Sequence, residues 1–261
     1  MAADPIERAV ERSIVTMYEN MTSSVTIDVM ARAAMFSKFH FARVFHRTTG
    51  VSPGRFLSAI RLQQAKHLLV TTSLNVTEVS MRVGYNSVGT FSSRFTSNVG
   101  LCPSSFRRQG GFTPQIAPAT PIETRHPVGG QVTGSVCTPT GRPGLIYLGL
   151  FPDRLPAGRP IRCTILDRPG HFSLDDVPDG QWHLLAHFVG TTRLVDAASR
   201  PFGDDDGLAV AAHGPITVRA GAVCVVDLPL RPITLLDPPV LMALLDQRKF
   251  ALELVAGRHA A

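Results

Sequence analysis

VMARAAMFSKFHFARVFHRTTGVSPGRF, residues 29–56, returns fifty residues later in altered form as VSMRVGYNSVGTFSSRFTSNVGLCPSSF, residues 79–106. A repeat at a fixed offset indicates two structural units built to one plan, so it constrains the fold more than any single motif. The pairs that are identical at this offset are Val29/Val79, Arg32/Arg82, Ser37/Ser87, Phe41/Phe91, Phe45/Phe95, Gly50/Gly100, Pro53/Pro103 and Phe56/Phe106. The chemical class is also kept at Ala33/Val83, Met35/Tyr85, Val51/Leu101 and Asp28/Glu78.

Each copy predicts two short helices around a tight turn, followed by Gly-x-x-Pro. The first helix of the first copy is capped by Thr26 or Ser24. The second helix of each copy has a serine N-cap and a C-terminal glycine, and a proline begins the helix after it: Ser37, Gly50 and Pro53, then Ser87, Gly100 and Pro103. Apolar residues spaced by three and four predict helices over residues 6–21, 27–34, 38–48, 53–71, 76–83 and 87–98, and a last short one through residue 106.

Two helices around a tight turn are the outline of a helix-turn-helix, whose second helix enters the DNA major groove. Two such units in tandem predict a reader of two successive stretches of groove. The helix expected between them has about twenty residues, which at ~1.5 Å rise span roughly 30 Å. That length is close to the ~34–36 Å of one turn of B-DNA.

The charge distribution supports a polyanionic partner for the repeated half. The formal net charge is +6. Residues 1–110 hold thirteen Lys and Arg against six Asp and Glu, whereas residues 111–261 hold thirteen against fourteen. The positive excess therefore lies in the repeat, where it attracts nucleic acid or serves only solubility.

Cysteine usage and hydropathy predict a soluble cytoplasmic protein. The four cysteines are far apart and form no C-x-x-C motif, which is typical of a reduced compartment. Charged residues interrupt the N-terminal segment, so no signal-peptide core is expected. No uncharged apolar run approaches the roughly 20 residues that span a bilayer.

The pattern changes after the repeat, and three regions are expected. Residues 1–108 form an all-α double helix-turn-helix domain, and the Gly- and Pro-rich residues 109–127 form a linker. Residues 128–261 form an all-β antiparallel sandwich, because short apolar runs alternate with turn residues. The expected strands are 131–136, 145–151, 161–166, 182–189, 216–218 and 223–230, with a short helix at 240–245 and a last element at 250–255.

The helix of residues 38–48 carries the strongest candidates for DNA contact. Phe41, Val44 and Phe45 form its buried stripe, and the opposite arc holds Phe39, His40, Arg43, His46 and Arg47. Arg43 can donate two parallel bonds to a guanine edge, and Phe39 offers apolar contact to a thymine methyl. Lys38 and Arg47 are better placed for phosphates. The alternative is an ordinary solvated helix face.

A longer pattern resembles the AraC/XylS family of transcription regulators over residues 8–108. The matching elements are Val29-Met30-Ala31-Arg32, Met35-Phe36-Ser37, Phe41-x-Arg43-x-Phe45-x-Arg47, Gly50-x-Ser52-Pro53, Arg61-Leu62-x-x-Ala65-x-x-Leu68-Leu69, Val79, Gly84-Tyr85-x-Ser87, Phe91-Ser92, Phe95 and Gly100-x-x-Pro103-Ser104-x-Phe106-Arg107. The resemblance implies seven helices whose two recognition helices, residues 38–48 and 87–98, enter adjacent major grooves. The implied DNA-binding residues are Ser37, Lys38, Phe39, His40, Arg43, His46, Arg47, Ser87, Gly89, Thr90, Ser93 and Arg94.

Two features depart from the family pattern. At an offset of fifty the outer arc of the first recognition helix becomes uncharged, with Gly89, Thr90, Ser93, Thr96 and Ser97 in place of Phe39, His40, Arg43, His46 and Arg47. Arg82 and Arg94 remain nearby for phosphates. We therefore expect the first unit to dominate base readout. The DNA-binding domain also comes first, whereas the family more often places it last.

Residues 128–232 resemble transthyretin-like or carboxypeptidase-regulatory-like sandwiches at turn and core positions. The matching elements are Val132-x-Gly134-x-Val136, Pro169-Gly170-x-Phe172-x-Leu174, Val177-Pro178-x-Gly180-x-Trp182-x-Leu184 and Gly214-Pro215-Ile216-x-Val218. His183 and His187 stand more than ~13 Å apart along a strand, so we expect no metal site. The run of residues 204–207 is expected to be a solvated turn. We expect no cofactor.

These observations predict a DNA-binding transcription regulator whose partner is double-stranded DNA. The β-sandwich senses a small-molecule effector or binds a protein partner. No nucleophile and base arrangement is evident, so no enzyme is expected. The alternative is a ligand-binding or enzymatic sandwich that the first domain tethers to nucleic acid.

Overall fold

The computed structural model describes residues 4–23, 25–111, 129–137, 144–190 and 208–241. The chain divides into two units, which are described separately. One unit is helical and comprises residues 1–112, 155–158 and 234–243. The other is rich in strands and comprises residues 113–154, 159–233 and 244–261. No helix in the described ranges is long and apolar enough to cross a membrane.

The helical unit follows the expected helix order closely. Its helices are α1 Pro5–Glu19, α2 Ile27–Ala33, α3 Lys38–Thr49, α4 Pro53–Thr71, α5 Val76–Arg82, α6 Val88–Val99 and α7 Pro103–Arg108. The Thr26 hydroxyl accepts a bond from the Val29 amide, so Thr26 is the N-cap of α2. Gly50 and Gly100 end α3 and α6 with φ of 75° and 90°, a conformation that glycine adopts without a Cβ clash.

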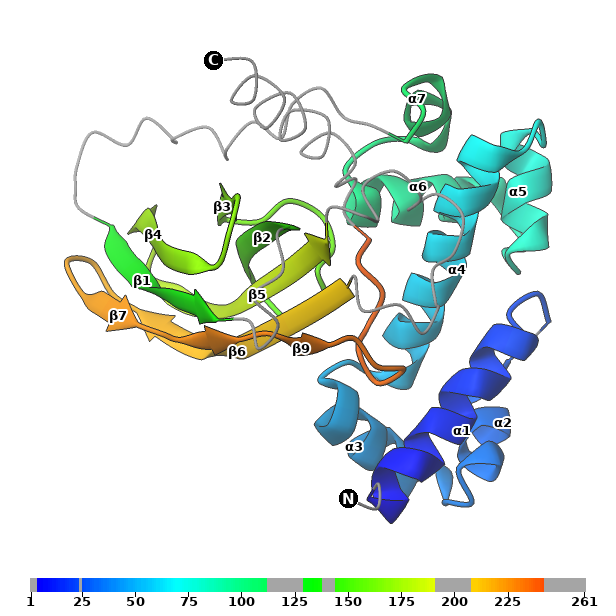
Figure 1. Ribbon diagram of the computed structural model, residues 1–261. Coiled ribbons are helices and arrows are strands. Elements are labelled where there is room, and N and C mark those ends of the chain that lie inside the picture. The colour runs from blue at the N-terminus through cyan, green and yellow to red at the C-terminus, as the bar shows by residue number, and fades with distance from the viewer. Residues whose placement is uncertain (1–3, 24, 112–128, 138–143, 191–207, 242–261) are drawn as a thin grey trace. The chain divides into compact units, whose positions relative to one another are not determined.

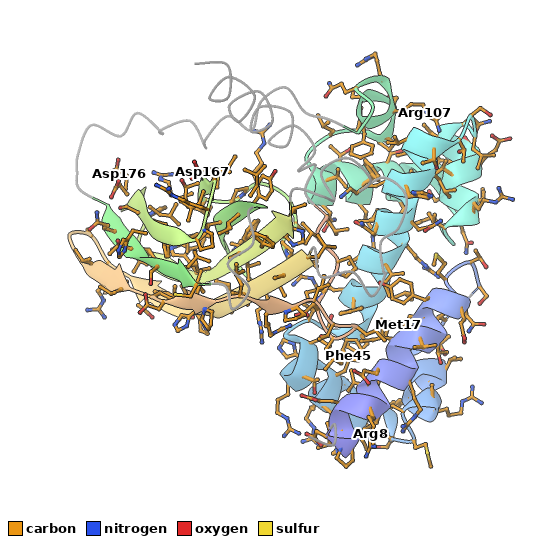
Figure 2. All side chains as sticks on the ribbon, viewed as in Figure 1. Arg8, Met17, Phe45, Arg107, Asp167 and Asp176 are labelled. Carbon is orange, nitrogen blue, oxygen red and sulfur yellow. The ribbon has the colours of Figure 1, made fainter. Side chains whose placement is uncertain are left out.

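The repeated phenylalanines are the core of each copy. Phe41, Phe45 and Phe56 form a chain of buried rings whose neighbouring centroids are 5.4 Å apart. Phe91, Phe95 and Phe106 repeat that chain at 5.6 Å and 5.4 Å. Phe45 of α3 belongs to the same core as Met17 of α1, and both are labelled in Figure 2. Aromatic side chains bury a large apolar area, which explains why both copies keep them.

Helix α4 connects the two copies. The group α1–α3 lies at one end of α4 and the group α5–α7 at the other (Figure 1). The buried side chains Phe56, Leu57, Ile60, Ala65 and Leu69 belong to one core that includes both groups. The two copies are therefore parts of one folded unit.

Two short segments from late in the chain complete the helical unit, and no pattern in the sequence predicted them. Leu155 and Leu241 are buried in its core, with exposed fractions of 4% and 0%. The Leu241 amide donates to the Pro156 carbonyl at 3.1 Å, and the Gly158 amide donates to the Asn98 carbonyl at 2.6 Å. Asn98 lies in the last turn of α6, where carbonyl groups lack a partner within the helix.

The strand-rich unit contains two sheets. Its strands are β1 Gly130–Cys137, β2 Gly144–Phe151, β3 Arg162–Leu166, β4 Gly170–Val177, β5 Gly180–Gly190, β6 Leu208–Val218, β7 Val223–Val225, β8 Leu228–Pro229 and β9 Arg231–Pro232. One sheet has the order β4-β1-β7, with β8 also paired to β1, and the other has the order β3-β2-β5-β6-β9. The recorded pairs are antiparallel except β1 with β7 and with β8, which are parallel.

Both sheets contribute to a single apolar core. Val132 and Phe172 come from the first sheet, and Ile146, Leu148 and Leu184 come from the second. Sequence patterns did not predict β4, because only Phe172, Leu174 and Val177 are buried in a segment that is otherwise polar. The first half of β6 and the short β9 were missed as well. Several expected segments lie outside the described residues: the element at 250–255, the run 204–207 and most of the linker. Of the helix expected at 240–245 only Val240 and Leu241 are described, and they are not helical.

Candidate nucleic-acid interface

Helix α3 presents a basic and aromatic face to solvent. Phe41, Val44 and Phe45 are buried as expected. The exposed side chains of its outer arc and N-terminal end are Lys38, Phe39, His40, Arg43, His46 and Arg47. Ser37 occupies the N-cap position with an extended backbone, and its exposed side chain makes no capping hydrogen bond. The structure thus brings together on one helix every candidate that the sequence assigned to the first copy.

An exposed apolar pair lies at the start of this face. Phe39 is 75% exposed, and Met35 in the preceding turn is 82% exposed. The Lys38 Nζ lies 5.6 Å from the centroid of the Phe39 ring, and the His40 ring packs edge-on against Phe36 at 4.8 Å. A large apolar side chain beside a cation suits a surface that meets both base edges and phosphates. The exposure of Met35 was not expected from the sequence.

Helix α6 presents a smaller and less charged face. Gly89, Thr90, Ser93 and Arg94 are exposed, and Phe91, Phe95 and Val99 are buried. Ser87 is the N-cap, and its hydroxyl accepts from the Thr90 amide at 3.3 Å. Arg94 is the one charged side chain within Val88–Val99. Hydroxyl groups can donate to phosphates or bases, but they add little to long-range attraction.

One position distinguishes α3 from α6 more sharply than the outer arc does. Val44 of α3 is 3% exposed, whereas Arg94, fifty residues later, is exposed. The second copy thus has a charge where the first has a core valine. Burial lowers the pKa of Arg61 in α4; Tyr85 opposes this shift and the charge of Arg94 adds to it.

The offset of fifty holds for the second helices but is wrong for the first. Helix α2, Ile27–Ala33, corresponds to α5, Val76–Arg82, at an offset of forty-nine. The turns agree, because the Phe36 amide bonds the Ala31 carbonyl as the Tyr85 amide bonds the Ser80 carbonyl. The second copy therefore has one more residue between this aromatic residue and the serine cap.

Because the first helices are related by forty-nine residues, several pairs matched from the sequence at fifty are not structurally equivalent. These pairs are Val29/Val79, Arg32/Arg82, Ala33/Val83, Asp28/Glu78 and Met35/Tyr85. The partner of Tyr85 is Phe36, and Met35 corresponds to Gly84; both have positive φ, 61° and 82°. The identities from Ser37/Ser87 onward agree with the structure, since the Phe41 and Phe91 amides bond the Ser37 and Ser87 carbonyls alike.

The remaining candidates from the sequence do not converge. Among the residues that the structure describes, no group of three His, Cys, Asp or Glu side chains could hold a metal ion. His187 pairs with Tyr147 across β5 and β2, and His183 pairs with Phe151. The four cysteines are free thiols.

Arg61 makes contacts that no sequence pattern indicated, although it lies within the motif Arg61-Leu62-x-x-Ala65. The Arg61 Nε donates to the Met21 carbonyl and its Nη2 to the Ser23 carbonyl, both at 2.9 Å. These acceptors lie between α1 and α2, forty and thirty-eight residues away. Periodicity shows only that Arg61 is a polar residue on an otherwise apolar helix, and such a signal does not reveal its partners.

Comparisons with known proteins match the helical part. A family model described as a helix-turn-helix domain matches residues 30–109. An uncharacterized HTH-type transcriptional regulator of Haemophilus influenzae is 30% identical over 102 residues, which cover 39% of this chain and 34% of that protein. The HTH-type transcriptional activator AarP of Providencia stuartii is 30% identical over 88 residues, 34% of this chain and 65% of AarP. The HTH-type transcriptional regulator MtrA of Neisseria gonorrhoeae is 36% identical over 85 residues, 33% of this chain and 28% of MtrA.

The chain thus spans less than two thirds of the length of these relatives. Among solved structures, the DNA-binding domain of AdpA in complex with a target DNA is 27% identical, with a TM-score of 0.37, over 41% of this chain and 92% of that one.

Proposed function

Residues 30–109 form a helix-turn-helix domain of the AraC type, and on this basis we propose that the chain is a sequence-specific DNA-binding transcription regulator. The two helix-turn-helix units engage adjacent major grooves of double-stranded DNA. The first unit dominates base readout, and the second mainly contacts phosphates. The comparisons point to transcription regulators rather than to enzymes.

The observation that carries this proposal is the contrast between the two exposed helix faces. Arg43 stands at the centre of the α3 face, and Ser93 stands at the equivalent place on α6. An arginine can bind guanine through two bonds, whereas a serine hydroxyl bonds any base or phosphate without strong preference. Lys38 and Arg47 flank Arg43 and would position α3 on the backbone.

The connecting helix has a length that suits binding on one face of the duplex. The nineteen residues of α4 span about 28 Å at ~1.5 Å per residue. Successive major grooves are about 34 Å apart.

The strand-rich unit is proposed to be a β-sandwich that senses a small molecule or binds a protein. Its support is the apolar core to which both sheets contribute. The proposed organisation is a DNA-binding domain over residues 1–108, a linker over 109–127 and the sandwich over 128–261. Residues 155–158 and 234–241 are exceptions, because they pack in the helical unit.

Selection of DNA by the full-length chain from a pool of randomised duplexes tests this function. We expect an enriched motif with two elements about one helical turn apart, the first with more sequence information than the second. Footprinting of the enriched duplex should then show two protected stretches on one face. Absence of any enriched motif at low salt would refute the proposal.

A further inference from the structure

Arg61 lies where the two helix-turn-helix units meet. The first unit is the group α1–α3, and the second unit is the group α5–α7. Its two bonds to the Met21 and Ser23 carbonyls hold the loop between α1 and α2, which belongs to the first unit. On the other side, its guanidinium carbon lies 5.9 Å from the centroid of the Tyr85 ring. Tyr85 belongs to the turn between α5 and α6 of the second unit. One side chain of α4 thus contacts both units.

The second unit approaches the first at Gly84. A Cβ atom on Gly84 would lie 2.3 Å from the Met21 carbonyl oxygen and 2.9 Å from the Arg61 Nη2. Gly84 has a φ of +82°, which is also unfavourable for any side chain. The Met21 carbonyl, which accepts a bond from Arg61, therefore packs directly against the backbone of Gly84 in the second unit. Any larger residue at position 84 would push the units apart.

Tyr85 attaches the same turn to α4. It is 7% exposed, and its hydroxyl forms a hydrogen bond of 3.2 Å with the Ser58 hydroxyl, one helical turn before Arg61. Its ring also packs against Phe91 of α6 at 5.4 Å. The orientation of the recognition helix α6 is thus linked through Tyr85 to Ser58 and Arg61. In the first unit the aromatic residue equivalent to Tyr85 is Phe36, which has no hydroxyl group and whose ring packs edge-on against His40.

We propose that Arg61 is a positioning residue that holds the two helix-turn-helix units at one separation and orientation, and so sets the spacing between DNA half-sites that the protein accepts. This proposal rests on the proposed two-unit binding of DNA and adds the residue that sets its geometry. Arg107 of α7 also donates a bond to α4, from its Nε to the Leu69 carbonyl at 2.9 Å, but this bond joins α4 to the second unit alone. Apart from this bond and the Ser58–Tyr85 bond, the contacts of α4 with the two units are mainly apolar and therefore non-directional. The two guanidinium bonds have fixed directions, because the five donors of arginine lie in one plane.

The affinity of two linked binding units depends on how well their connection matches the distance between their sites. A rigid connection gives high affinity at one spacing and poor affinity at others. When the connection loosens, affinity at the best spacing falls while other spacings become tolerated. Loss of Arg61 should thus change the dependence on spacing, which a general loss of stability would not do.

The experiment uses the full-length chain and the duplex enriched by the selection described above. Duplexes with one or two base pairs inserted or deleted between the two elements are compared with the parent duplex. Their dissociation constants are measured for the wild type, Arg61→Met and Arg61→Lys. Lysine keeps the charge but lacks the planar fork, so it separates geometry from electrostatics.

The matched control is Arg12→Ala. The Arg12 Nε donates to the Ala33 carbonyl at 3.3 Å, a bond of the same kind that lies wholly within the first unit. Thermal unfolding of every variant measures its stability. Tyr85→Phe is a milder variant, because it removes only the bond to Ser58 and keeps the ring beside Arg61.

We expect the ratio of affinities between the best and the shifted spacing to fall at least about fivefold in both Arg61 variants, the lower end of typical coupling between sites. Discrimination among single bases in the first element should be unchanged. Tyr85→Phe should lower the ratio less, and Arg12→Ala should leave it unchanged. A ratio unchanged in folded Arg61→Lys and Tyr85→Phe, or lowered equally by Arg12→Ala, would overturn the proposal. A wild type that binds only one element would instead refute the two-unit function.

Discussion

Replacement of Arg43 by alanine tests the unequal roles proposed for α3 and α6. Arg43 is exposed and lies on the outer arc of α3, so its truncation leaves no cavity and should change the free energy of unfolding by no more than about 0.5 kcal/mol. A bidentate arginine–guanine contact contributes about 1–3 kcal/mol of discrimination. Arg43→Ala should thus weaken binding to the selected duplex about 5- to 150-fold.

The matched substitution is Ser93→Ala, at the equivalent position of α6. A hydrogen bond between neutral groups contributes about 0.5–1.5 kcal/mol, and only when it is made. We expect Ser93→Ala to weaken binding by no more than about twelvefold, and by only about twofold at the lower end of that range. The two losses of affinity should differ because equivalent positions of α3 and α6 hold an arginine and a serine.

Fluorescence anisotropy with labelled duplexes provides the measurement. Each protein is titrated against the selected duplex and against all its single-base variants at one fixed salt concentration, because affinity for DNA depends strongly on salt. Arg43→Ala should lose its preference at one base position and keep the others. Thermal unfolding checks that the variants remain folded.

Two results would refute the reasoning. Equal losses of affinity for Arg43→Ala and Ser93→Ala would show that the first unit does not dominate base readout. A uniform loss for Arg43→Ala on every base variant would show that Arg43 contacts a phosphate rather than a base.

Three further predictions concern the helical unit. Arg47→Ala should weaken binding about equally for every sequence and reduce the slope of log affinity against log salt by about 1, because a phosphate contact releases about one counterion; an altered base preference in the same titrations would contradict this. Leu241→Ala should lower the free energy of unfolding by about 2–5 kcal/mol, because the Leu241 side chain is fully buried in the core of the helical unit. Chemical denaturation measures this free energy. The control is Val225→Ala, which should change the free energy of unfolding little because Val225 is exposed. Burial lowers the pKa of Lys66 to about 7. Between pH 7 and about 10 the unfolded chain therefore binds more protons than the folded chain, and the free energy of unfolding should rise with pH. Lys66→Met should reduce that rise in thermal unfolding scans, and parallel pH profiles of the variant and the wild type would be evidence against it.

The sequence by itself determined which helices form in the helical half and in which order. Its signals are local: Ser87 and Thr26 cap helices through nearby amides, Gly50 and Gly100 adopt positive φ, and the phenylalanines recur at helical spacing. Periodicity also separated the buried stripe of α3 from its exposed arc. The candidate residues on that arc could thus be named from sequence, because exposure on a short helix follows from its phase.

The tertiary structure decided what depends on distant parts of the chain. An offset of fifty fitted the sequence identities, and only the backbone bonds of the turns showed that α2 and α5 are related by forty-nine. Strand β4 needed its partner β1 to be recognised, because a half-polar segment has little propensity of its own.

The same is true of the joint between the two units and of the segments that complete the helical core. Arg61 bonds carbonyls about forty residues away, and Leu155 and Leu241 pack among helices far from them in sequence. Local patterns determine which helices form and which faces they bury. The relative placement of those helices, and hence the spacing of α3 and α6, depends on contacts between distant parts of the chain, which exist only once the chain is folded.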